Sequence, residues 1–362
     1  MTDESGTHDA GERPLRKGWT TGACAAAAAK SAYWALTTGQ FLDPVEIALP
    51  GGQRPSFQLA EQELSDAFAR AGIVKDAGDD PDVTHGALIR AELRPANAGT
   101  GIIFKAGAGV GTVTRAGLPL AAGEPAINPA PRRMIADNLG AAADLEITIS
   151  VENGLALARS TWNPRLGIEG GLSILGTTGV VIPYSCSAWI ASIHQAVDVA
   201  RAAGWDHIAA CTGSTSEAGI AGMHGMAPER IVDMGNFIGG LLKYLRTHPV
   251  PRLSIAGGFA KLSKLAAGHM DLHSKRSQVD PAFLAGLAAE AGADKDVVAR
   301  MVGASTAAEI LGMAKEENIA LGDAVARVAR QVSLEATRGG PDMEVVIFDR
   351  AGTLAGQAPF GS

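Results

Sequence analysis

The segment His207-Ile208-Ala209-Ala210-Cys211-Thr212-Gly213-Ser214 has the pattern of a short apolar strand that ends in a Gly-containing turn. The same pattern recurs at Leu253–Ala256, which runs into Gly257-Gly258-Phe259, and at Leu172–Leu175, which runs into Gly176-Thr177-Thr178-Gly179. Strand, Gly-rich turn and helix in repeated succession are typical of a parallel sheet covered by helices. The second half of the chain is therefore predicted to be an α/β domain with a mainly parallel sheet.

Hydrophobic periodicity predicts the helices of this half. Apolar residues recur at spacings of three and four between about Ser187 and Ala203, which places them on one helical face. A second helix is predicted from Pro228 to Arg246, because Pro228 would occupy the favoured first helical position. Met343–Phe348 predicts a last strand of the same sheet. A helix before that strand is predicted from the stripe Leu321, Val325, Val328 and Val332.

The first half shows strands and helices in a mixed order, which favours an α+β domain. The Ala-rich run from Ala23 to Leu36 predicts a helix, since Ala has the highest helix propensity, and Thr21 is its predicted N-cap. A further helical stretch is predicted from Leu64 to Ala71. Strands are predicted at Val45–Leu49, Ala87–Leu93, Gly101–Phe104, Gly111–Thr114 and Leu145–Val151.

The length of 362 residues predicts two domains, at roughly 100–200 residues each. Residues 1–14 are polar and are expected to be a disordered tail. Residues 15–165 are expected to form the α+β domain on the substrate side. Residues 166–362 are expected to form the α/β domain, with a donor-binding crevice at its strand ends and a helical C-terminal region.

Composition argues against several classes of protein. A formal net charge of −7 without a long basic run does not suit a nucleic-acid partner, because phosphate neutralisation supplies most of that affinity. No apolar run reaches the roughly 18 residues of a membrane span, and the N-terminus lacks the pattern of a signal peptide. The three cysteines form no CxxC pair, which fits a reducing compartment. A cytoplasmic protein without membrane contact is therefore expected.

The Gly-rich turns predict a ligand site, because ligands of open parallel sheets bind beyond the carboxyl ends of the strands. Unpaired amides at the following helix starts suit a carboxylate or phosphate, and the turn hydroxyls suit a nucleoside or amino acid. Three ordinary strand-to-helix turns without a ligand are the alternative. The segment Gly257–Ser263 faintly resembles a Walker motif, but its spacing is wrong. The candidate binding residues are Gly176, Thr177, Thr178, Gly179, Thr212, Gly213, Ser214 and Asp233.

Three other segments carry candidate site residues. The loop Lys75–His85 holds four acids, including Asp76, and is either a solvated turn or a functional site. The Pro-rich run Gly123–Arg133 presents two guanidiniums, which either bind a substrate carboxylate or lie on the surface. His269 and His273 are four apart and would share a helical face, but no third ligand accompanies them, so no protein-bound metal is expected.

These segments together resemble the CbiD family, the cobalt-precorrin-5B C(1)-methyltransferases of anaerobic cobalamin biosynthesis. The most specific matches are Gly123–Pro129 and Ser173–Gly179. The likeness covers almost everything from Leu15 to the C-terminus. Two positions depart from the family pattern: Ala260 stands where many relatives have Gly, and Ala23 stands where a hydroxyl residue is frequent. The other matching segments are Leu15–Cys24, Lys75–Gly86, Gly109–Arg115, Asn163–Gly179, Met234–Phe237 and Lys261–Ser277.

The resemblance implies an S-adenosylmethionine-dependent C-methyltransferase. The donor would methylate carbon 1 of cobalt-precorrin-5B to give cobalt-precorrin-6A, and cobalt would enter only as part of the substrate. It also implies a fold other than the usual tetrapyrrole methyltransferase fold. A corrinoid carrier without catalysis and a small-molecule kinase are the alternatives from other classes. A homodimer and transient contacts with neighbouring pathway enzymes are the protein partners considered.

The acceptor carries many carboxylate arms, so it is expected where an acidic chain gathers local positive charge, in a cleft between the domains. The candidate catalytic groups are Asp76, His269 and His273, with no choice made among them. The candidate substrate-binding residues are Thr20, Thr21, Arg132, Lys261 and Lys275. Further available cations are Lys17, Arg115, Arg165, Lys264 and Arg276.

Overall fold

The computed structural model describes residues 13–140 and 144–361, which form two compact units. Unit 1 comprises the chain up to Thr114 together with Pro119–Ser185, and unit 2 comprises Arg115–Leu118 and Cys186 onward. Most of the predicted tail, residues 1–14, lies outside the described residues. The predicted mixed α/β fold class is confirmed, with a largely antiparallel sheet in unit 1 and a mainly parallel sheet in unit 2.

Unit 1 contains a five-stranded sheet in the order β4-β5-β6-β9-β7. All neighbouring strands are antiparallel except β7 and β9, which are parallel. Two strands, β6 and β9, match their predicted positions closely. The strand bounds are β4 Glu61–Leu64, β5 Ala69–Val74, β6 Leu88–Pro95, β7 Ile102–Ala106 and β9 Leu145–Val151.

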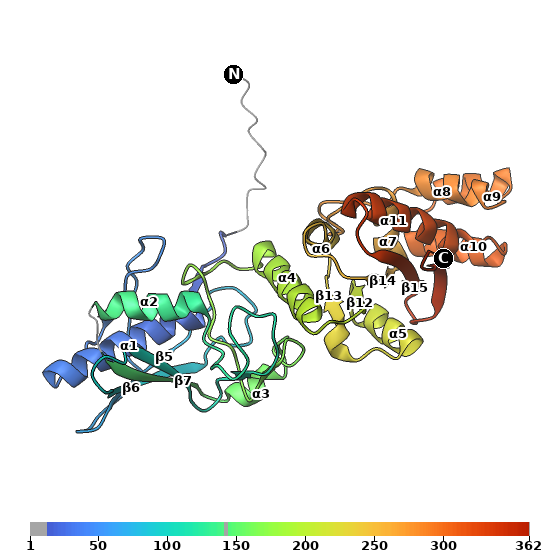
Figure 1. The fold of residues 1–362 in the computed structure, drawn as a ribbon. Coiled ribbons are helices and arrows are strands. Elements are labelled where there is room, and N and C mark those ends of the chain that lie inside the picture. The colour runs from blue at the N-terminus through green and yellow to red at the C-terminus, as the bar shows by residue number, and fades with distance from the viewer. Residues whose placement is uncertain (1–12, 141–143, 362) are drawn as a thin grey trace, which may run out of the picture. The chain divides into compact units, whose positions relative to one another are not determined.

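One face of this sheet is covered by α1 (Thr21–Thr38), and α2 (Pro129–Leu139) lies beside α1 (Figure 1). The run Ala25–Ala29 is completely buried. Small side chains let the helix approach both the sheet and α2, while alternate residues of β5, β6 and β9 turn their apolar side chains toward it. The Ala-rich segment thus forms a buried central helix.

Two predictions for unit 1 are wrong. The stretch from Leu64 to Ala71 is a hairpin between β4 and β5 rather than a helix. Small alternating residues place Ala69 and Ala71 against α1, and this tertiary contact overrides local helix propensity. The N-cap of α1 is Thr20, one residue before the predicted Thr21.

The rest of unit 1 consists of short pairings and one short helix, α3 (Gly154–Ala158). Segment Leu172–Leu175 was predicted to be a strand of the parallel sheet in unit 2, and this prediction is wrong. The segment belongs to unit 1, where it forms isolated bridges. The three two-stranded pairs are β1 Gly18–Trp19 with β11 Val180–Val181, β2 Val45–Glu46 with β3 Ser56–Phe57, and β8 Thr112–Val113 with β10 Ile168–Glu169.

Unit 2 is built on a five-stranded sheet in the order β13-β12-β14-β15-β16. The first four strands are parallel and β16 is antiparallel, so the predicted mainly parallel sheet is confirmed. The strand bounds are β12 His207–Cys211, β13 Ile231–Asp233, β14 Arg252–Gly258, β15 Asp342–Phe348 and β16 Leu354–Ala358.

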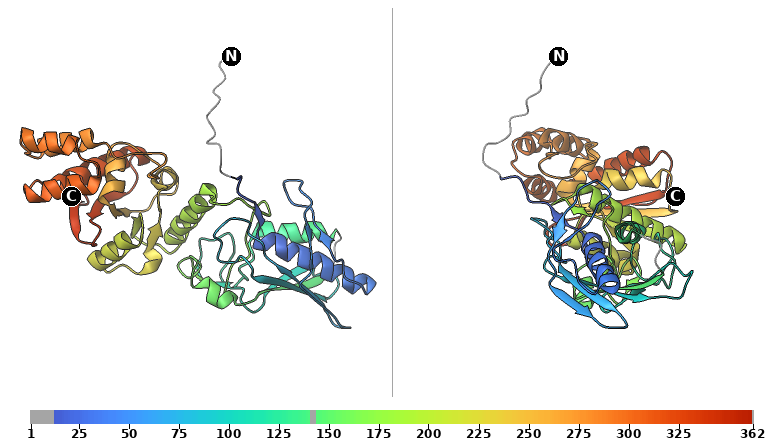
Figure 2. Two further views of the ribbon diagram at one scale, coloured as in Figure 1. Left: turned by 180° about the vertical axis from the view of Figure 1, so that it is seen from behind. Right: turned by 90° about the vertical axis from the view of Figure 1, so that its left-hand side faces the viewer.

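Helices cover both faces of this sheet (Figure 1 and Figure 2). Side chains alternate along each strand, so Ala209 and Cys211 pack with Ile220 of α5, whereas Ile208 and Ala210 join the larger core on the other face. The larger core includes α6, α7 and α11. The helix bounds are α4 Cys186–Ala202, α5 Ser214–His224, α6 Ile238–Leu245, α7 Phe259–Ala266, α8 Pro281–Glu290, α9 Lys295–Val302, α10 Ala307–Glu316 and α11 Leu321–Thr337.

The predicted helix from Pro228 to Arg246 is wrong as a single element. It divides into a 3-10 turn at Pro228–Arg230, strand β13 and helix α6. The apolar residues of β13 fill the sheet edge beside β12, and Gly235 then takes a positive φ of 53° that ends extended structure.

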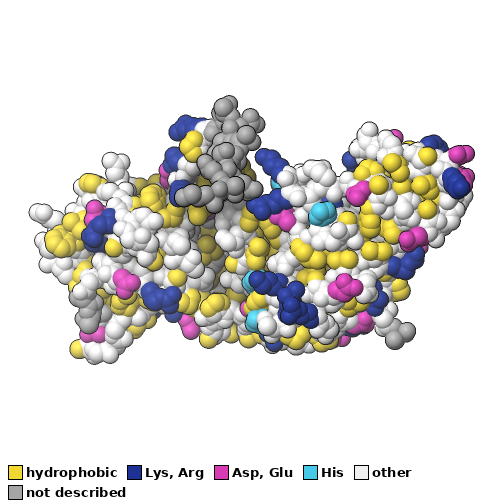
Figure 3. Space-filling view, turned by 90° about the horizontal axis from the view of Figure 1, so that it is seen from above, with side chains coloured by type: hydrophobic (Ala, Val, Ile, Leu, Met, Phe, Trp, Pro, Cys, Tyr) yellow, Lys and Arg dark blue, Asp and Glu magenta, His cyan; other side chains and the backbone are white. Residues whose placement is uncertain are grey.

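Basic side chains are dispersed on the face of the molecule drawn in Figure 3. On the face drawn in Figure 3, Lys and Arg form small separate groups with Asp and Glu between them. Positive charge is therefore local on this face, as expected for a chain with a formal net charge of −7. Within the described residues, no helix is both long and apolar enough to cross a membrane.

Candidate functional site

A pocket of about 860 Å³ lies in unit 2 at the carboxyl ends of three neighbouring strands. Its walls include Thr212–Ser216 after β12, Gly258–Lys261 after β14 and Phe348–Ala351 after β15. This is the edge at which parallel α/β sheets bind ligands, and the volume suits a small organic molecule. The sequence predicted a ligand site at these strand ends, and a pocket is present there.

Three helices begin at this pocket: α5 after Gly213, α7 after Gly258, and α10 after Thr306. The first amides of a helix have no partner within the helix and carry its positive partial charge. Ser214 and Thr215 lie in the first turn of α5 with exposed side chains. The pocket therefore offers amides and hydroxyls to an anionic or polar group.

Lys261 lies in the first turn of α7 and lines the pocket. Its Nζ donates a hydrogen bond of 2.7 Å to the carbonyl oxygen of Thr212. Burial lowers the pKa of the Lys261 ammonium, although nearby Asp233 favours the charged form. Lys264, one turn further along the helix, donates to the carbonyl oxygen of Leu272 over 3.1 Å and so holds the following loop.

The charged lining is mainly basic. Four basic residues, Lys261, Lys264, Lys315 and Arg350, face one acid, Asp349. Lys315 Nζ lies 2.8 Å from the Asp349 carboxylate, and this hydrogen bond lowers the pKa of Asp349. The remaining positive charge favours a ligand that carries a carboxylate.

The predicted residues of this region divide into two groups. Thr212, Gly213, Ser214 and Lys261 all line the pocket. Asp233 ends the edge strand β13, and its carboxylate accepts a hydrogen bond from the amide of Gly235 over 3.1 Å. This hydrogen bond stabilises the turn that follows β13. Sequence reasoning did not find the walls formed by Ser305–Ala308, Leu311 and Phe348–Ala351, because none of these wall segments contains a Gly-rich turn.

The turn Gly176–Gly179 was predicted at the strand ends of the second sheet, and this placement is wrong. The turn belongs to unit 1, where the amide of Thr20 donates to the carbonyl oxygen of Gly179 over 3.0 Å. Gly176 has a φ of 120°, and a Cβ there would lie 2.3 Å from the Thr20 hydroxyl oxygen. The turn thus packs on the start of α1, with Thr177 and Thr178 exposed.

The hydroxyls of Thr20 and Thr21 hold the backbone together. Thr20 Oγ1 accepts the amide of Ala23 over 3.2 Å, which caps α1. Thr21 Oγ1 donates to the carbonyl oxygen of Leu175 and accepts the Leu175 amide over 3.0 Å. Both side chains are buried. The Thr21 hydroxyl holds Leu175, the residue before the exposed turn, and the Thr20 hydroxyl fixes the helix start on which the turn packs.

Two acids of the acidic loop, Asp76 and Asp82, form ion pairs with Arg16 and Lys75. Arg16 binds the Asp76 carboxylate, and this hydrogen bond, with a further one from the Gly78 amide, lowers the pKa of Asp76 to about 2. Asp76 is therefore ionised at neutral pH. Lys75 is only 1% exposed, and its Nζ lies 2.6 Å from the Asp82 carboxylate.

Arg132 is engaged within unit 1. Its Nε donates to the carbonyl oxygen of Ile127 over 2.8 Å, and its Nη2 lies 2.7 Å from the Glu124 carboxylate. The guanidinium also lies over the Phe104 ring, 5.5 Å from the centroid. These contacts brace the Pro-rich segment, whereas the neighbouring Arg133 is exposed.

Four sequence motifs meet at the start of α1. The amide of Trp19 donates to the carbonyl oxygen of Asp76 over 2.7 Å, and the Gly22 amide donates to that of Leu175 over 3.0 Å. The Asn128 amide donates to the carbonyl oxygen of Ile174, which attaches the Pro-rich segment as well. The acidic loop, the Pro-rich segment and the Gly176–Gly179 turn thus form one cluster, here called the α1 cluster.

The predicted helical face shared by His269 and His273 is wrong. Both residues lie in the irregular loop between α7 and α8, and both are exposed. His273 Nδ1 accepts the amide of Lys275 over 3.2 Å, which shapes this loop. The loop is attached to α7 by the hydrogen bond from Lys264 described above.

A second polar cluster was missed by sequence reasoning. His207, His224 and Glu344 lie together in unit 2, with one potential ligand atom from each within 4.8 Å of the others. They come from distant parts of the sequence, and no short spacing motif connects them. Only the strand order of the sheet brings them together.

Comparisons with known proteins agree with one another. The family profile described as CbiD matches residues 8–183, and the profile described as CbiD, C-terminal domain, matches residues 271–359. Cobalt-precorrin-5B C(1)-methyltransferase of Paramagnetospirillum magneticum is 58% identical over 96% of this chain and 99% of that protein. The protein of the same name from Brucella canis is 56% identical over 98% of this chain and 99% of that protein.

One solved structure is also similar to this chain. It is the crystal structure of the cobalamin biosynthesis protein cbiD from Archaeoglobus fulgidus, with 30% sequence identity. The match covers 72% of this chain and 83% of that chain, with a TM-score of 0.39.

Proposed function

This chain belongs to the CbiD family, and we propose that it transfers a methyl group from S-adenosylmethionine to carbon 1 of cobalt-precorrin-5B, giving cobalt-precorrin-6A. The observation that carries this proposal is the 58% identity, which extends over 96% of the chain. The chain is accordingly a methyltransferase, and its reaction requires a methyl donor and a corrinoid acceptor.

The pocket of unit 2 is the proposed donor site. The methionine carboxylate of the donor fits the start of α5, where the amides of Ser214 and Thr215 and the Lys261 ammonium supply positive charge. Phe259 and Leu311 offer apolar walls for the adenine ring. This arrangement uses Thr212, Gly213 and Ser214 in the role that the sequence predicted.

The α1 cluster of unit 1 is the proposed acceptor site. Thr177 and Thr178 are exposed there, and the same stretch of chain also exposes the apolar side chains of Leu175, Ile182 and Tyr184. A corrin ring has apolar faces and polar arms, so it needs a surface of both kinds. The buried Thr20 and Thr21 act in this proposal by holding the turn, rather than by contacting the ring.

The reaction forms a carbon–carbon bond at carbon 1 while the bond between the methyl carbon and sulfur breaks. The electron pair comes from the macrocycle, and the sulfonium leaves as a neutral thioether. Asp76 is already ionised and paired with Arg16, so it is unsuited to act as a general acid. Alignment of donor and acceptor is the proposed main source of rate enhancement. His269 and His273 are exposed in a loop of unit 2, and their part in the reaction stays a prediction.

Anaerobic incubation with methyl-labelled donor and cobalt-precorrin-5B tests the proposed function. Label is expected to move into the corrinoid, with S-adenosylhomocysteine formed in equal amount. A folded protein that binds the corrinoid but transfers no label would contradict the proposal and favour a carrier. Isothermal calorimetry with S-adenosylhomocysteine tests the donor site separately, because a carrier is expected to give no heat.

A further inference from the structure

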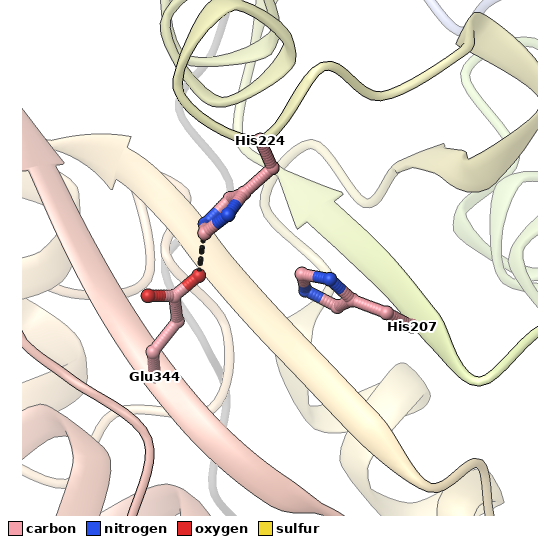
Figure 4. Close-up of side chains that lie close together, drawn as sticks. All are labelled: His207, His224 and Glu344. Carbon is pink, nitrogen blue, oxygen red and sulfur yellow. Dashed lines mark hydrogen bonds and ion pairs between the residues drawn. The ribbon is translucent and has the colours of Figure 1, made fainter.

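Two imidazole rings and a carboxylate converge at one place on the α5 face of the unit 2 sheet (Figure 4). His207 begins β12, Glu344 lies near the start of β15, and His224 ends α5. One potential ligand atom from each residue lies within 4.8 Å of the others. Three separate elements thus present nitrogen and oxygen donors to a common point.

The fold explains why these side chains meet. Alternate residues of a strand point to the same face, and His207 shares its face with Ala209 and Cys211, which pack against α5. Glu344 likewise shares its face with Val346 and Phe348. Because α5 starts at the carboxyl ends of the strands and returns along the sheet, its last residue reaches the amino ends.

The charge balance of the cluster is unusual for a buried position. The Glu344 side chain is 2% exposed, and a buried carboxylate is costly unless a positive charge or several hydrogen bonds compensate it. Among the residues that the structure describes, His224 is the one basic side chain within ion-pair distance, with Nε2 at 2.5 Å from Oε1. Hydrogen bonds from His224, Ser254 and Gln357 reach this carboxylate, and a cation bound among His207, His224 and Glu344 would add direct compensation of its charge.

We propose that His207, His224 and Glu344 form a binding site for a divalent transition metal ion, with zinc as the best match. Two imidazole nitrogens and one carboxylate oxygen are a common set of protein ligands for zinc, and they leave a fourth position for water. Donors at 2.0–2.1 Å from a tetrahedral ion lie roughly 3.3 Å apart. The three atoms already lie within 4.8 Å of one another, and the 2.5 Å separation of His224 and Glu344 would lengthen as an ion takes the place of their hydrogen bond.

Neighbouring groups hold these ligands in place. Gln357 Nε2 donates to Oε2 of Glu344 over 3.2 Å, which leaves Oε1 directed toward the histidines. Ser254 Oγ donates to Oε1 of Glu344 and lies 2.6 Å from Nε2 of His207, so it joins the two ligands. The Phe360 ring covers His207 edge-on at 5.2 Å between centroids. Polar partners and an apolar cover are the usual surroundings of a metal site.

The site is separate from the proposed methyl transfer. The pocket lies at the carboxyl ends of the strands, whereas this cluster lies at the amino ends of β12 and β15, so the ion would act on structure. It would attach the last turn of α5 to the sheet. The side chain of His224 is 25% exposed, which gives an ion access from solvent.

The test uses the full chain after removal of metals with a chelator, titrated with Zn²⁺ by calorimetry and with Co²⁺ by visible absorption. We expect one zinc ion per chain and the visible bands of four-coordinate cobalt. Zinc at about a hundredfold excess over its dissociation constant is expected to raise the melting temperature by about 5–10 °C.

Four variants make the test specific. His224→Ala and Glu344→Gln are each expected to weaken zinc binding at least a hundredfold and to abolish the cobalt bands. The matched controls, His248→Ala and Glu290→Gln, change the same residue types in unit 2 outside the cluster and are expected to bind like the parent. His224 is partly exposed, so its variant decides the question even if Glu344→Gln does not fold.

Three outcomes would contradict the proposed metal site. They are the absence of stoichiometric zinc binding by the parent chain, unchanged binding by His224→Ala, and cobalt bands that persist in both cluster variants. In each case the cluster would be a hydrogen-bonded network without an ion. None of these results depends on methyl transfer, so failure of the proposed function would leave the test intact.

Discussion

Lys261 Nζ donates a 2.7 Å hydrogen bond to the carbonyl oxygen of Thr212, which joins the first turn of α7 to the end of β12 inside the pocket. If the donor carboxylate binds there, Lys261→Met removes its nearest positive charge. A lost charge-assisted contact of about 1.5–3 kcal/mol predicts a ten- to hundredfold weaker affinity for S-adenosylhomocysteine. Calorimetry measures this loss, and Lys243→Met, on an exposed position of α6, is the matched control.

The same lysine predicts a pH dependence of donor binding. Burial lowers the pKa of Lys261 below its ordinary value of 10.5, so its charge is lost at a lower pH than that of a surface lysine. Donor affinity is expected to be constant below that lowered pKa and to fall as the pH rises through it. Calorimetry with the parent and Lys261→Met over a series of alkaline pH values checks this. A parallel decline in both proteins would show that another group is responsible.

A pair of double variants locates the donor. Ser214→Ala/Thr215→Ala alters the pocket, and Thr177→Ala/Thr178→Ala alters the turn of the α1 cluster. Two lost hydroxyl contacts at about 1 kcal/mol each predict a roughly thirtyfold loss of affinity for S-adenosylhomocysteine in the pocket variant and little change in the turn variant. The reverse result would move the donor to the start of α1.

Arg132→Ala tests whether this residue supports the fold or binds substrate. Its guanidinium contacts Ile127, Glu124 and Phe104, so its removal is expected to destabilise unit 1 by about 2 kcal/mol. Arg133→Ala, at the exposed neighbouring position, is expected to stay within about 0.5 kcal/mol of the parent. Denaturant unfolding measures both. A raised Michaelis constant for the corrinoid in a variant of unchanged stability would instead assign Arg132 to substrate binding.

The three thiols are expected to differ in reactivity. Cys24 is fully buried, and burial raises the pKa of its thiol to about 12, so almost no thiolate exists near pH 8. Cys211 is also buried, whereas Cys186 is exposed. A thiol reagent is expected to modify one cysteine in the native protein and three after unfolding. Cys186→Ser is expected to abolish the native reaction, and a persistent fast thiol would show that a buried cysteine becomes accessible.

The sequence predicted the strands whose side chains alternate or are uniformly buried. Strands β9 and β12 lie where their apolar patterns placed them, because burial on a sheet leaves a direct record in sequence. Helix α5 was missed, since Ser214–His224 is rich in Gly, Ser and Thr and shows no apolar stripe. Strand β13 was merged into a helix because Ile231 and Met234 also fit a helical spacing.

The candidate site was predictable only in part. Thr212, Gly213 and Ser214 follow a recognisable strand and line the pocket, as a parallel sheet requires. The turn at Gly176 has the same local pattern, but its pairing partner is the start of α1, and no local pattern specifies a partner. His207, His224 and Glu344 escaped detection for a related reason, since strand order is set by the whole core.

Helix α5 lies so close to the sheet that a Cβ on Gly219 would come within 2.5 Å of the Phe348 ring. One end of the helix, Ser214, lines the pocket, and the other end, His224, belongs to the histidine cluster. The helix is therefore in close contact with the sheet at Gly219. A side chain added at Gly219 would clash with the Phe348 ring and push α5 away from the sheet at this point. A substitution at this one position would therefore disturb a helix that contributes to both the pocket and the histidine cluster.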